Sequence, residues 1–399
     1  MSLPDRIWVP ALLAALLALG FVGALLVRAD GDPSLLVHAG PPWTQTDGAR
    51  GSLTVQPADK AFDGQFFYRL GVRPWSTDRT VDGVTFDLPS LRNARWGYGA
   101  LAFVVSAGDP DLVPWALIGL NVAAATAVGA VGGGLARSSE RHAAWGVVLA
   151  LWPGFAYSLS LDTSELVASA FVLGALLALR HRAWLGAGAL FLAAVLVRDT
   201  TAVVPFGVAL AGFWLWLRAD PDVDVDVDVD EDHRHDGRRL LAVGAIPLVA
   251  FGGWQLLQRA RFGALPLTSS GDKNLSAPLG GLFDQLGKLV PPEGGDEAFR
   301  LLAAAALITL IGAAAWVWRR SDTPFVERVA WIPAVAVVVL LNAYLWSGAT
   351  AFLRAATEAG LLSILVVLGS RRERLVALMA LGLAGMWLLT AASQVAKLG

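Results

Sequence analysis

Long apolar runs separated by short charged segments dominate the chain. The first run, Ile7–Val27, is 21 residues long, and a helix needs about 20 apolar residues to cross the ~30 Å hydrocarbon core of a bilayer. We expect this run to be retained, because no small-x-small cleavage site precedes Arg28. Ten further runs predict spans at Leu112–Leu135, Ala143–Leu161, Leu166–Leu179, Ala183–Val197, Ala202–Leu217, Leu240–Leu257, Leu301–Val317, Val329–Trp346, Ala351–Leu368 and Leu375–Ala392. The pattern predicts an all-α, polytopic transmembrane bundle of about eleven spans.

One apolar run, Trp96–Ala107, is too short for a comfortable crossing and favours a segment lying along the membrane surface. If it does not cross, the arginine clusters of the short loops all fall on one side, as is typical of the cytoplasmic side. These clusters contain Arg137, Arg141, Arg180, Arg182, Arg218, Arg238, Arg239, Arg319, Arg320, Arg328, Arg371, Arg372 and Arg374. We therefore predict a multi-pass plasma-membrane protein with a cytoplasmic N-terminus.

The long loops divide this bundle into three parts. Residues 1–217 form an N-terminal module whose extracytoplasmic loop, residues 28–111, contains the predicted membrane-parallel helix. Residues 218–239 form an acidic cytoplasmic linker. Residues 240–399 form the C-terminal helices, with a second outer loop at residues 259–300.

Composition agrees with a membrane protein and excludes several other classes. Of the 399 residues, 55% are hydrophobic and 16% are charged, whereas soluble domains carry about 25% charged residues. The net charge of −2 hides a split, because residues 220–236 hold nine acids and one arginine, which leaves 24 acids and 30 bases elsewhere. That excess is too small for a nucleic-acid-binding domain. The absence of cysteine excludes disulfides, thiolate chemistry and cysteine-bound zinc.

Unusual polar residues gather in the segments predicted to lie outside. Charged groups at membrane depth are costly and normally face protein or a watery cavity, so they mark candidate functional sites. Arg354 and Glu358 are four residues apart within one predicted span, on one helical face. The remaining candidates are Asp63, followed by Gly-Gln-Phe-Phe-Tyr, then Asp87, Arg92, Arg95, Glu165, Arg198 and Asp199.

Most of these residues also have a structural interpretation. The pair Arg198–Asp199 would suit a solvated turn, and Arg354 with Glu358 would suit an ion pair that locks the bundle. Glu165 would interact favourably with the positive end of its own helix. Asp63 fits a generic loop least well, because four aromatic residues surround it, a sequence better suited to a sugar or lipid head-group site.

Acids and arginines at the outer membrane surface suit transfer of a sugar from a lipid phosphate. A carboxylate such as Asp63 would accept the proton of the acceptor hydroxyl. Arginines would hold the phosphate and stabilise the charge that it gains on leaving. Arg92, Arg95, Arg198 and Arg354 could supply those groups.

The layout resembles the GT-C superfamily of integral-membrane glycosyltransferases, which includes protein O-mannosyltransferases and lipid A aminoarabinose transferases. In that family an acid follows the first helix in a large outer loop with membrane-parallel helices. The string after Asp63 is similar, more closely, to uncharacterised prokaryotic members with Asp-Gly-Gln-aromatic-Tyr, Asp-x-Pro-x-x-Arg-x-x-Arg, a later Glu and Arg-Glu-Thr. The matching residues are Asp63-Gly64-Gln65, Asp87-Leu88-Pro89 through Arg92 and Arg95, Glu165, and Arg198-Asp199-Thr200.

This resemblance implies an inverting glycosyltransferase of the cell envelope that uses a polyprenyl-phosphate-linked donor. Asp63 would be the general base and Glu165 a second catalytic acid. The implied substrate- and phosphate-binding residues are Gln65, Tyr68, Asp87, Arg92, Arg95, Arg198, Asp199 and Arg354. The acceptor would be a glycan, a lipid or a protein. No cofactor is required, and a divalent cation is left open, because Asp199 replaces the family's Glu and no adjacent acid accompanies Asp63.

Two other classes stay open. A transporter or flippase for a lipid-linked or small polar solute is the main alternative, although transporters often show inverted repeats and ionisable groups near mid-membrane, and neither is visible here. A non-catalytic membrane scaffold would leave the Asp-Gly-Gln loop without a use.

Overall fold

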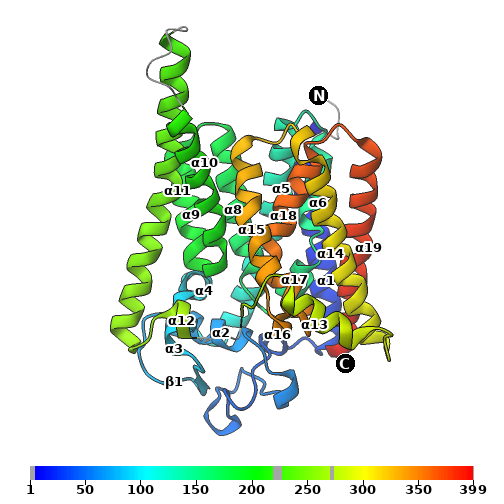
Figure 1. Ribbon diagram of the computed structural model, residues 1–399. Coiled ribbons are helices and arrows are strands. Elements are labelled where there is room, and N and C mark those ends of the chain that lie inside the picture. The colour runs from blue at the N-terminus through cyan, green and yellow to red at the C-terminus, as the bar shows by residue number, and fades with distance from the viewer. Residues whose placement is uncertain (1–4, 219–226, 270–273, 399) are drawn as a thin grey trace.

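The computed structural model describes residues 5–218, 227–269 and 274–398, and it is a bundle of helices with one small hairpin (Figure 1). The side chains of residues 227–234 are outside this description. The long helices run along one common direction, and short helices cover one end of the bundle. The all-α fold class is therefore confirmed. The helices of the bundle are α1 (Trp8–Arg28), α5 (Val113–Ser138), α6 (Val147–Ala150), α7 (Gly154–Ser160), α8 (Glu165–Arg180), α9 (Trp184–Val197), α10 (Val203–Arg218), α11 (Val227–Phe262), α14 (Gly295–Val317), α15 (Phe325–Leu340), α17 (Ala349–Ala355), α18 (Thr357–Leu368) and α19 (Glu373–Leu398).

Six described helices are long and apolar enough to cross a membrane, and the number rises to eight if each of two bent helix pairs is one span. The six segments are Trp8–Arg28, Val113–Ser138, Asp199–Arg218, His235–Phe262, Gly295–Arg320 and Glu373–Leu398. The bent pairs are Ala143–Ala150 with Gly154–Ser160, at 64°, and α17 with α18, at 61°. Three more predicted spans coincide with α8, α9 and α15, which have only 16, 14 and 16 residues. The protein thus has the helices of a membrane protein, and the count of eleven crossings stays a prediction.

The predicted C-terminal boundary of the ninth span is wrong. The predicted span Val329–Trp346 is divided in the structure, because α15 ends at Leu340 and a separate helix, α16 (Ala343–Trp346), follows. Leu341 leaves the helical conformation, with φ −58° and ψ 134°, and the Asn342 side chain accepts a hydrogen bond from the backbone N–H of Leu345. Asparagine favours such capping positions, so it starts a new helix here instead of continuing the old one.

Successive long helices alternate in direction, so that the charged clusters and the long loops lie at opposite ends (Figure 1). We call the end that carries the clusters around Arg137, Arg180 and Arg371 the arginine end, and the opposite end the loop end. At the arginine end, Arg180 Nε lies 2.6 Å from Glu327 Oε1 and joins α8 to α15. Residues 219–226 of the predicted acidic linker lie outside the described residues, whereas residues 227–239 belong to α11, and α19 finishes at the loop end.

The loop end carries the short elements that follow α1. They are α2 (Gly64–Val72), the antiparallel hairpin β1 (Thr80–Val81) and β2 (Val84–Thr85), α3 (Pro89–Ala94) and α4 (Trp96–Ser106), and later α12 (Pro266–Ser269), α13 (Gly280–Leu289) and α16. The helix α4 has 11 residues, so it is about 16 Å long, about half of the hydrocarbon core. A Cβ added at Gly99 would lie 2.2 Å from Leu70 Cβ. The short apolar run is therefore packed against α2 at the loop end, as expected of a segment that does not cross.

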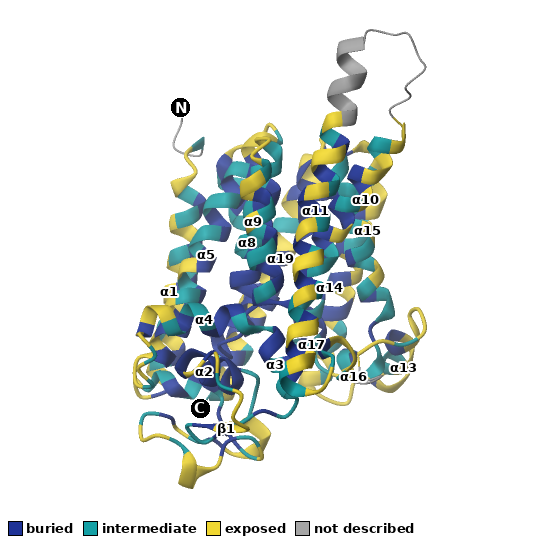
Figure 2. Cartoon of the chain, turned by 90° about the vertical axis from the view of Figure 1, so that its left-hand side faces the viewer, coloured by how far each residue is buried: buried dark blue, intermediate teal, exposed yellow. Residues whose placement is uncertain are grey.

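Buried residues fill the centre of the bundle and the elements that cover the loop end, whereas exposed residues follow the outside of α11 (Figure 2). Many of these exposed side chains are large and apolar, such as Ile246, Val249 and Leu256. An apolar outer surface is unfavourable in water and favourable against lipid tails. The burial pattern therefore agrees with a bundle immersed in a membrane.

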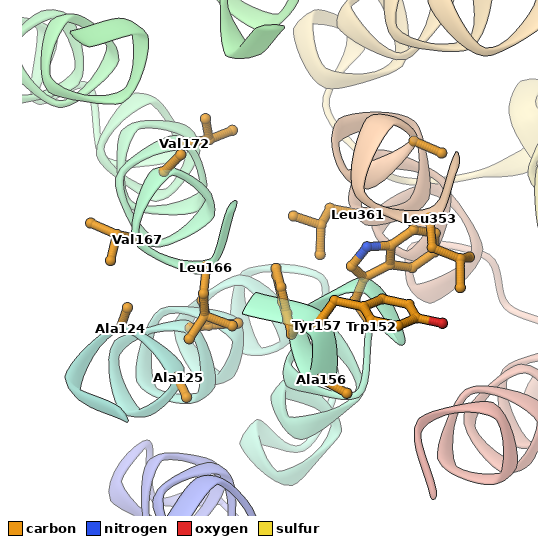
Figure 3. Packing of buried hydrophobic residues seen from close by; sticks show 14 of the residues in the cluster. Ala124, Ala125, Trp152, Ala156, Tyr157, Leu166, Val167, Val172, Leu353 and Leu361 are labelled. Carbon is orange, nitrogen blue, oxygen red and sulfur yellow. The ribbon is translucent and has the colours of Figure 1, made fainter. Parts of the chain in front are cut away.

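The two bent helix pairs meet in the core. Trp152 lies at the break between α6 and α7, and its Nε1 donates to Thr357 Oγ1 at 3.2 Å beside the other break. A Cβ added at Gly360 would lie 2.3 Å from the Trp152 ring. Figure 3 shows the indole of Trp152 beside Leu353 and Leu361. The tryptophan therefore fills the space that the bends open.

Close packing between α1 and α5 depends on glycine, and Gly129 and Gly133 have the four-residue spacing that is typical of close helix contacts in membranes. A Cβ at Gly129 would lie 2.4 Å from the Pro10 carbonyl oxygen. Gly119, on the same helix, is exposed, and a Cβ added there would meet nothing within 4 Å.

We expect Gly129→Leu to destabilise the protein, because the added side chain would force α1 and α5 apart, and overpacking costs ~1–3 kcal/mol or more. The measurement is the midpoint of thermal unfolding of the detergent-purified protein, with Gly119→Leu as the matched control. Equal midpoints for the two variants would contradict this account of the packing.

Candidate functional site

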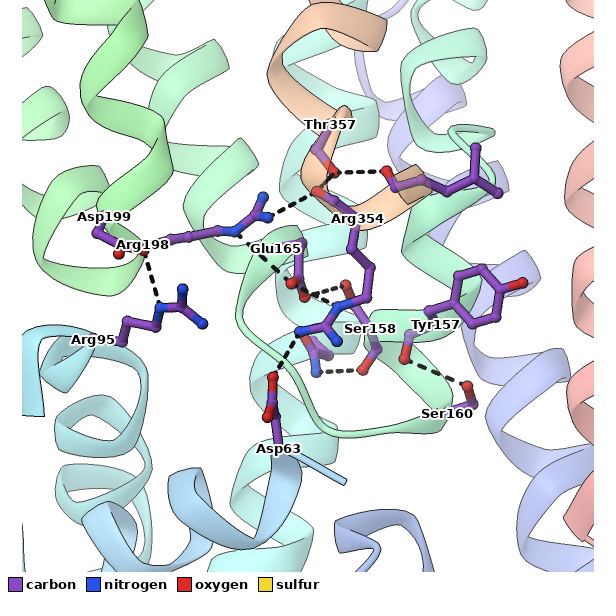
Figure 4. Close-up of polar contacts among 12 residues, drawn as sticks. Asp63, Arg95, Tyr157, Ser158, Ser160, Glu165, Arg198, Asp199, Arg354 and Thr357 are labelled. Carbon is purple, nitrogen blue, oxygen red and sulfur yellow. Dashed lines mark hydrogen bonds and ion pairs between the residues drawn. The ribbon is translucent and has the colours of Figure 1, made fainter. Parts of the chain in front are cut away.

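The candidate residues sit where elements begin, end or break at the loop end. Asp63 immediately precedes α2, and Glu165 is the first residue of α8. Arg198 follows the last residue of α9, and Arg354 lies in the last turn of α17. Figure 4 shows these four side chains approaching one another from the separate elements. Helix termini thus aim charged groups into one region while the helix interiors stay apolar.

Arg92 connects the loop residues of this site. Its Nε and Nη2 lie 2.7 Å from Asp87 Oδ1 and Oδ2, which makes a two-pronged ion pair, and its Nη1 donates to Asp63 Oδ1 at 2.9 Å. The guanidinium also lies 4.1 Å from the centroid of the Phe66 ring. A planar guanidinium held on both edges and on one face has a fixed orientation.

Arg354 connects Asp63 to the core of the bundle. Its Nε donates to Glu165 Oε1 at 2.7 Å, and its Nη2 lies 3.4 Å from Asp63 Oδ2. The second oxygen of Glu165 accepts a hydrogen bond from Ser158 Oγ at 3.1 Å. Two residues that are 291 positions apart, Asp63 and Arg354, therefore meet in one charged site.

Arg198 is held on every side. Its Nη1 lies 3.3 Å from Glu358 Oε1, its Nη2 donates to the Arg354 carbonyl oxygen at 2.7 Å, and its Nε lies 3.8 Å from Glu165 Oε1. Only 7% of its side chain is exposed. The side chain of Arg198 is less exposed than those of Arg92 and Arg354, which are 15% and 11% exposed.

The ion pair between Glu358 and Arg354 that the sequence suggested does not form. The spacing of four residues predicts a contact with Arg354 on one helical face, but the helix breaks between them at Ala356. The 61° bend turns Arg354 toward Glu165 and leaves Glu358 facing Arg198. The expectation holds only for a continuous helix.

A separate ion pair lies beside this network. Arg95 Nε lies 2.9 Å from Asp199 Oδ1, which ties the start of α4 to the turn after α9. Arg198 and Asp199 are therefore both paired, and neither belongs to a simple solvated turn. The site thus contains the four arginines and all four acids that the sequence analysis selected, together with Glu358.

Gln65 and Tyr68 lie in the loop but outside the network of ion pairs. The Gln65 side-chain oxygen accepts from Thr44 Oγ1 at 2.7 Å, and its amide donates to the Phe62 carbonyl oxygen at 2.9 Å. Tyr68 is fully buried, and burial raises its pKa to about 12. These contacts hold the folded loop together, so the aromatic string after Asp63 is packed inside the protein.

The charge of Asp63 depends on its arginines. Burial alone would raise the pKa of this carboxyl, but the charges of Arg92, Arg354 and Arg95 hold it well below its usual range. Asp63 is therefore ionised at neutral pH. Folding lowers the pKa of Asp63, so ionisation of this carboxyl stabilises the folded state. The contribution is complete at pH values above the usual carboxyl pKa, and it is lost as the pH falls from there toward the lowered pKa.

Each of the five carboxylates of the site pairs with an arginine. Among the described residues, no group of three or more His, Cys, Asp or Glu side chains is placed to hold a metal ion. A cavity of about 590 Å³ lies elsewhere, near the other end of α2, between Arg73, Trp75 and Phe103. The site itself is a closed network of ion pairs.

No family model, curated protein or solved structure matches the chain. The functional argument therefore depends on the geometry of the site.

We expect Glu165→Gln to destabilise the protein strongly, because Arg354 and Arg198 would keep buried positive charges with fewer partners. Removing one member of a buried pair costs ~3–5 kcal/mol. The control is Glu373→Gln, which removes the 73% exposed partner of Arg141 at the arginine end and should cost less than ~1 kcal/mol. The readout is again the thermal midpoint in detergent, and a larger loss in the control would refute the role of Glu165.

Proposed function

We propose that the protein is a membrane glycosyltransferase of GT-C type that transfers a sugar from a polyprenyl phosphate to an acceptor at the loop end. The observation that carries this proposal is the position of Asp63 between Arg92 and Arg354, at 2.9 and 3.4 Å. A carboxylate and two guanidinium groups at one membrane surface are the groups that this reaction requires. The side chain of Asp63 is 25% exposed, the most of the three.

In this mechanism, binding of the lipid-linked sugar donor makes Asp63 available as the general base. A phosphate that binds to Arg92 and Arg354 competes with the Asp63 carboxylate for the same N–H groups. As Asp63 loses these contacts, its pKa rises from the lowered value toward the usual one. The carboxylate is then free to accept a proton, and it does so only when the donor is present.

The transfer step forms one bond and breaks one bond at the sugar. The acceptor hydroxyl oxygen attacks the anomeric carbon, the bond from that carbon to the phosphate oxygen breaks, and the hydroxyl proton goes to Asp63. The lipid phosphate leaves with both bonding electrons, and Arg92 and Arg354 stabilise its added charge. Attack from the side opposite the phosphate inverts the anomeric configuration.

The other members of the network position these groups. Glu165 fixes the Arg354 guanidinium at 2.7 Å and is itself 2% exposed. Arg198 and Glu358 stabilise the helix break that presents Arg354. We assign Glu165 and Arg198 to positioning, and Arg92, Arg354 and Asp63 to contact with the substrate.

A transporter for a lipid-linked or small polar solute is the second candidate. The observation in its favour is the pair of bent helices that meet at Trp152 and Thr357, because broken helices often form substrate sites in transporters. The ion-pair network lies at the loop end, however, and the break in the core is filled by an indole. We therefore favour the enzyme.

We expect Asp63→Asn to lose transfer activity by a factor of about 10²–10⁴, as is typical for removal of a catalytic base. The assay uses purified protein with labelled undecaprenyl-phosphate hexoses, and it follows release of the sugar to water and to membrane acceptors. Asp59→Asn, an exposed acid four residues earlier, is the matched control. Full activity of Asp63→Asn would remove it from the role of base.

The same donors distinguish the enzyme from the transporter. In proteoliposomes, a glycosyltransferase forms a new covalent product, whereas a transporter moves the labelled lipid between leaflets without chemical change. Movement with no transfer for the wild-type protein would support the second candidate.

We propose that the loop end is extracytoplasmic and the arginine end cytoplasmic, as the arginine clusters indicate. The chain has no cysteine, so single introduced cysteines can be labelled without background. In intact cells, a membrane-impermeant maleimide should label Ala58→Cys in the loop. Glu373→Cys at the arginine end should react only after permeabilisation. The reverse pattern would overturn the orientation.

A further inference from the structure

Asp162 is a buried acid without a partner. It lies in the turn between α7 and α8 and is 0% exposed. Neither carboxylate oxygen has a hydrogen bond, and no ion pair involves this residue among the described part of the chain. A bare carboxylate in such a place is strongly unfavourable. The folded protein must therefore neutralise it.

Further oxygens without partners lie in the same turn and beside it. The hydroxyl of Thr163 and the side-chain oxygen of Asn121 are buried and make no hydrogen bond within the described residues. The Ser158 carbonyl oxygen connects these residues, because it accepts from Asn121 Nδ2 at 3.1 Å and from the Thr163 backbone N–H at 3.2 Å. Four buried oxygens without partners, two of them from Asp162, therefore belong to this turn and to the α5 side chain that is hydrogen-bonded to it.

The neighbouring donors are already used. Tyr98 donates its hydroxyl to the Leu117 carbonyl oxygen at 2.9 Å and accepts from Asn121 Nδ2 at 2.8 Å. The amide of Asn121 is thereby fixed, with its oxygen left free. Arg354 and Arg198 point to Glu165 instead. These two arginines thus leave Asp162 uncompensated.

The backbone also favours this arrangement. Asp162 has a left-handed conformation, with φ 45°, which aspartate adopts more readily than most residues. A Cβ added at Gly64 would lie 2.6 Å from the Leu161 carbonyl oxygen, so the start of α2 covers the turn. The loop and the turn together shield the carboxylate from water.

We propose that Asp162, Asn121 and Thr163 bind one dehydrated alkali-metal cation, sodium or potassium. The carboxylate, amide and hydroxyl oxygens are ligands of hard cations. One unpaired carboxylate balances one positive charge, which selects a monovalent ion. Unwound backbone between helices is also where membrane proteins coordinate sodium.

A proton is the competing occupant, since burial raises the pKa of Asp162 well above its usual range. One proton, however, lets the carboxyl of Asp162 donate to only one of the other oxygens. A cation can be shared by all of them. His38 is the titratable group that the loop brings near Ser160, and burial lowers its pKa, so it is neutral at neutral pH and supplies no charge.

The bound cation would support the site next to it. Ser158 contributes its carbonyl oxygen to this turn and its hydroxyl to Glu165, which begins α8 three residues after Asp162. The cation would therefore fix the segment that presents Glu165 to Arg354. This inference stands independently of the proposed glycosyl transfer.

The test is a cation titration of the full-length purified protein. Sodium or potassium chloride replaces choline chloride at constant ionic strength, and the thermal unfolding midpoint is recorded. A ligand that binds only the folded state raises the midpoint in a saturable way. We expect such a rise for the wild type, and bound ²²Na⁺ or ⁸⁶Rb⁺ at one ion per chain in equilibrium dialysis.

The variants locate the ion. Asp162→Asn should abolish the saturable rise and the bound isotope, Asn121→Ala should weaken the apparent affinity at least tenfold, and Asp63→Asn should change neither. If Asp162→Asn does not fold, Asn121→Ala carries the comparison. Identical midpoints in sodium, potassium and choline would overturn the proposal and leave Asp162 as a neutral acid. A saturable rise that persists in Asp162→Asn would also overturn it.

Discussion

The structure of the loop end depends on the charge of Arg354. A guanidinium that is buried here must be neutralised locally, because moving an unpaired charge out of water costs several kcal/mol. Arg354 satisfies this constraint with Glu165 from the bundle and Asp63 from the loop. The same ion pairs therefore hold the loop on the bundle and place an acid beside two arginines. The ion pairs of Arg354 therefore stabilise the fold and also form the candidate site.

The bends in the helices explain how this arginine reaches both partners. In a straight helix the Arg354 carbonyl oxygen would accept only from its own helix. The break at Ala356 makes it available to Arg198 Nη2 and Thr357 Oγ1, at 2.7 and 2.8 Å. Trp152 fills the space that the break opens, and its indole N–H donates to the same threonine. The distortion is thus stabilised by hydrogen bonds and by packing.

The sequence was sufficient to predict the features that depend on local composition. Apolar runs located the helices, and the short length of Trp96–Ala107 predicted a segment at the loop end. Charged residues in the outer segments and within one predicted span were the candidates, and the structure brings them together. In each case the signal lies within a few neighbouring residues.

Features that depend on distant contacts could not be predicted in this way. The pairing of Glu358 with Arg198 depends on a bend that no proline or glycine marks at Ala356. The division after Leu340 depends on a cap at Asn342 inside an apolar run. The sequence shows Asp162 only as one polar residue in a turn. Its burial without a partner follows from the packing of the loop and α5 around that turn.

The balance of charge in the site decides which arginines can bind a phosphate. Five carboxylates face four arginines, so an anion can enter only if one carboxylate gives up its contacts. Glu165 and Glu358 are enclosed, with 2% and 6% of their side chains exposed, whereas Asp63 is 25% exposed. Asp63 is therefore the carboxylate that can move at the lowest free energy. The partners of Asp63 are Arg92 and Arg354, so a phosphate that displaces the Asp63 carboxylate binds to those two arginines. The same displacement releases Asp63, which lies beside the loop surface, to act as the base.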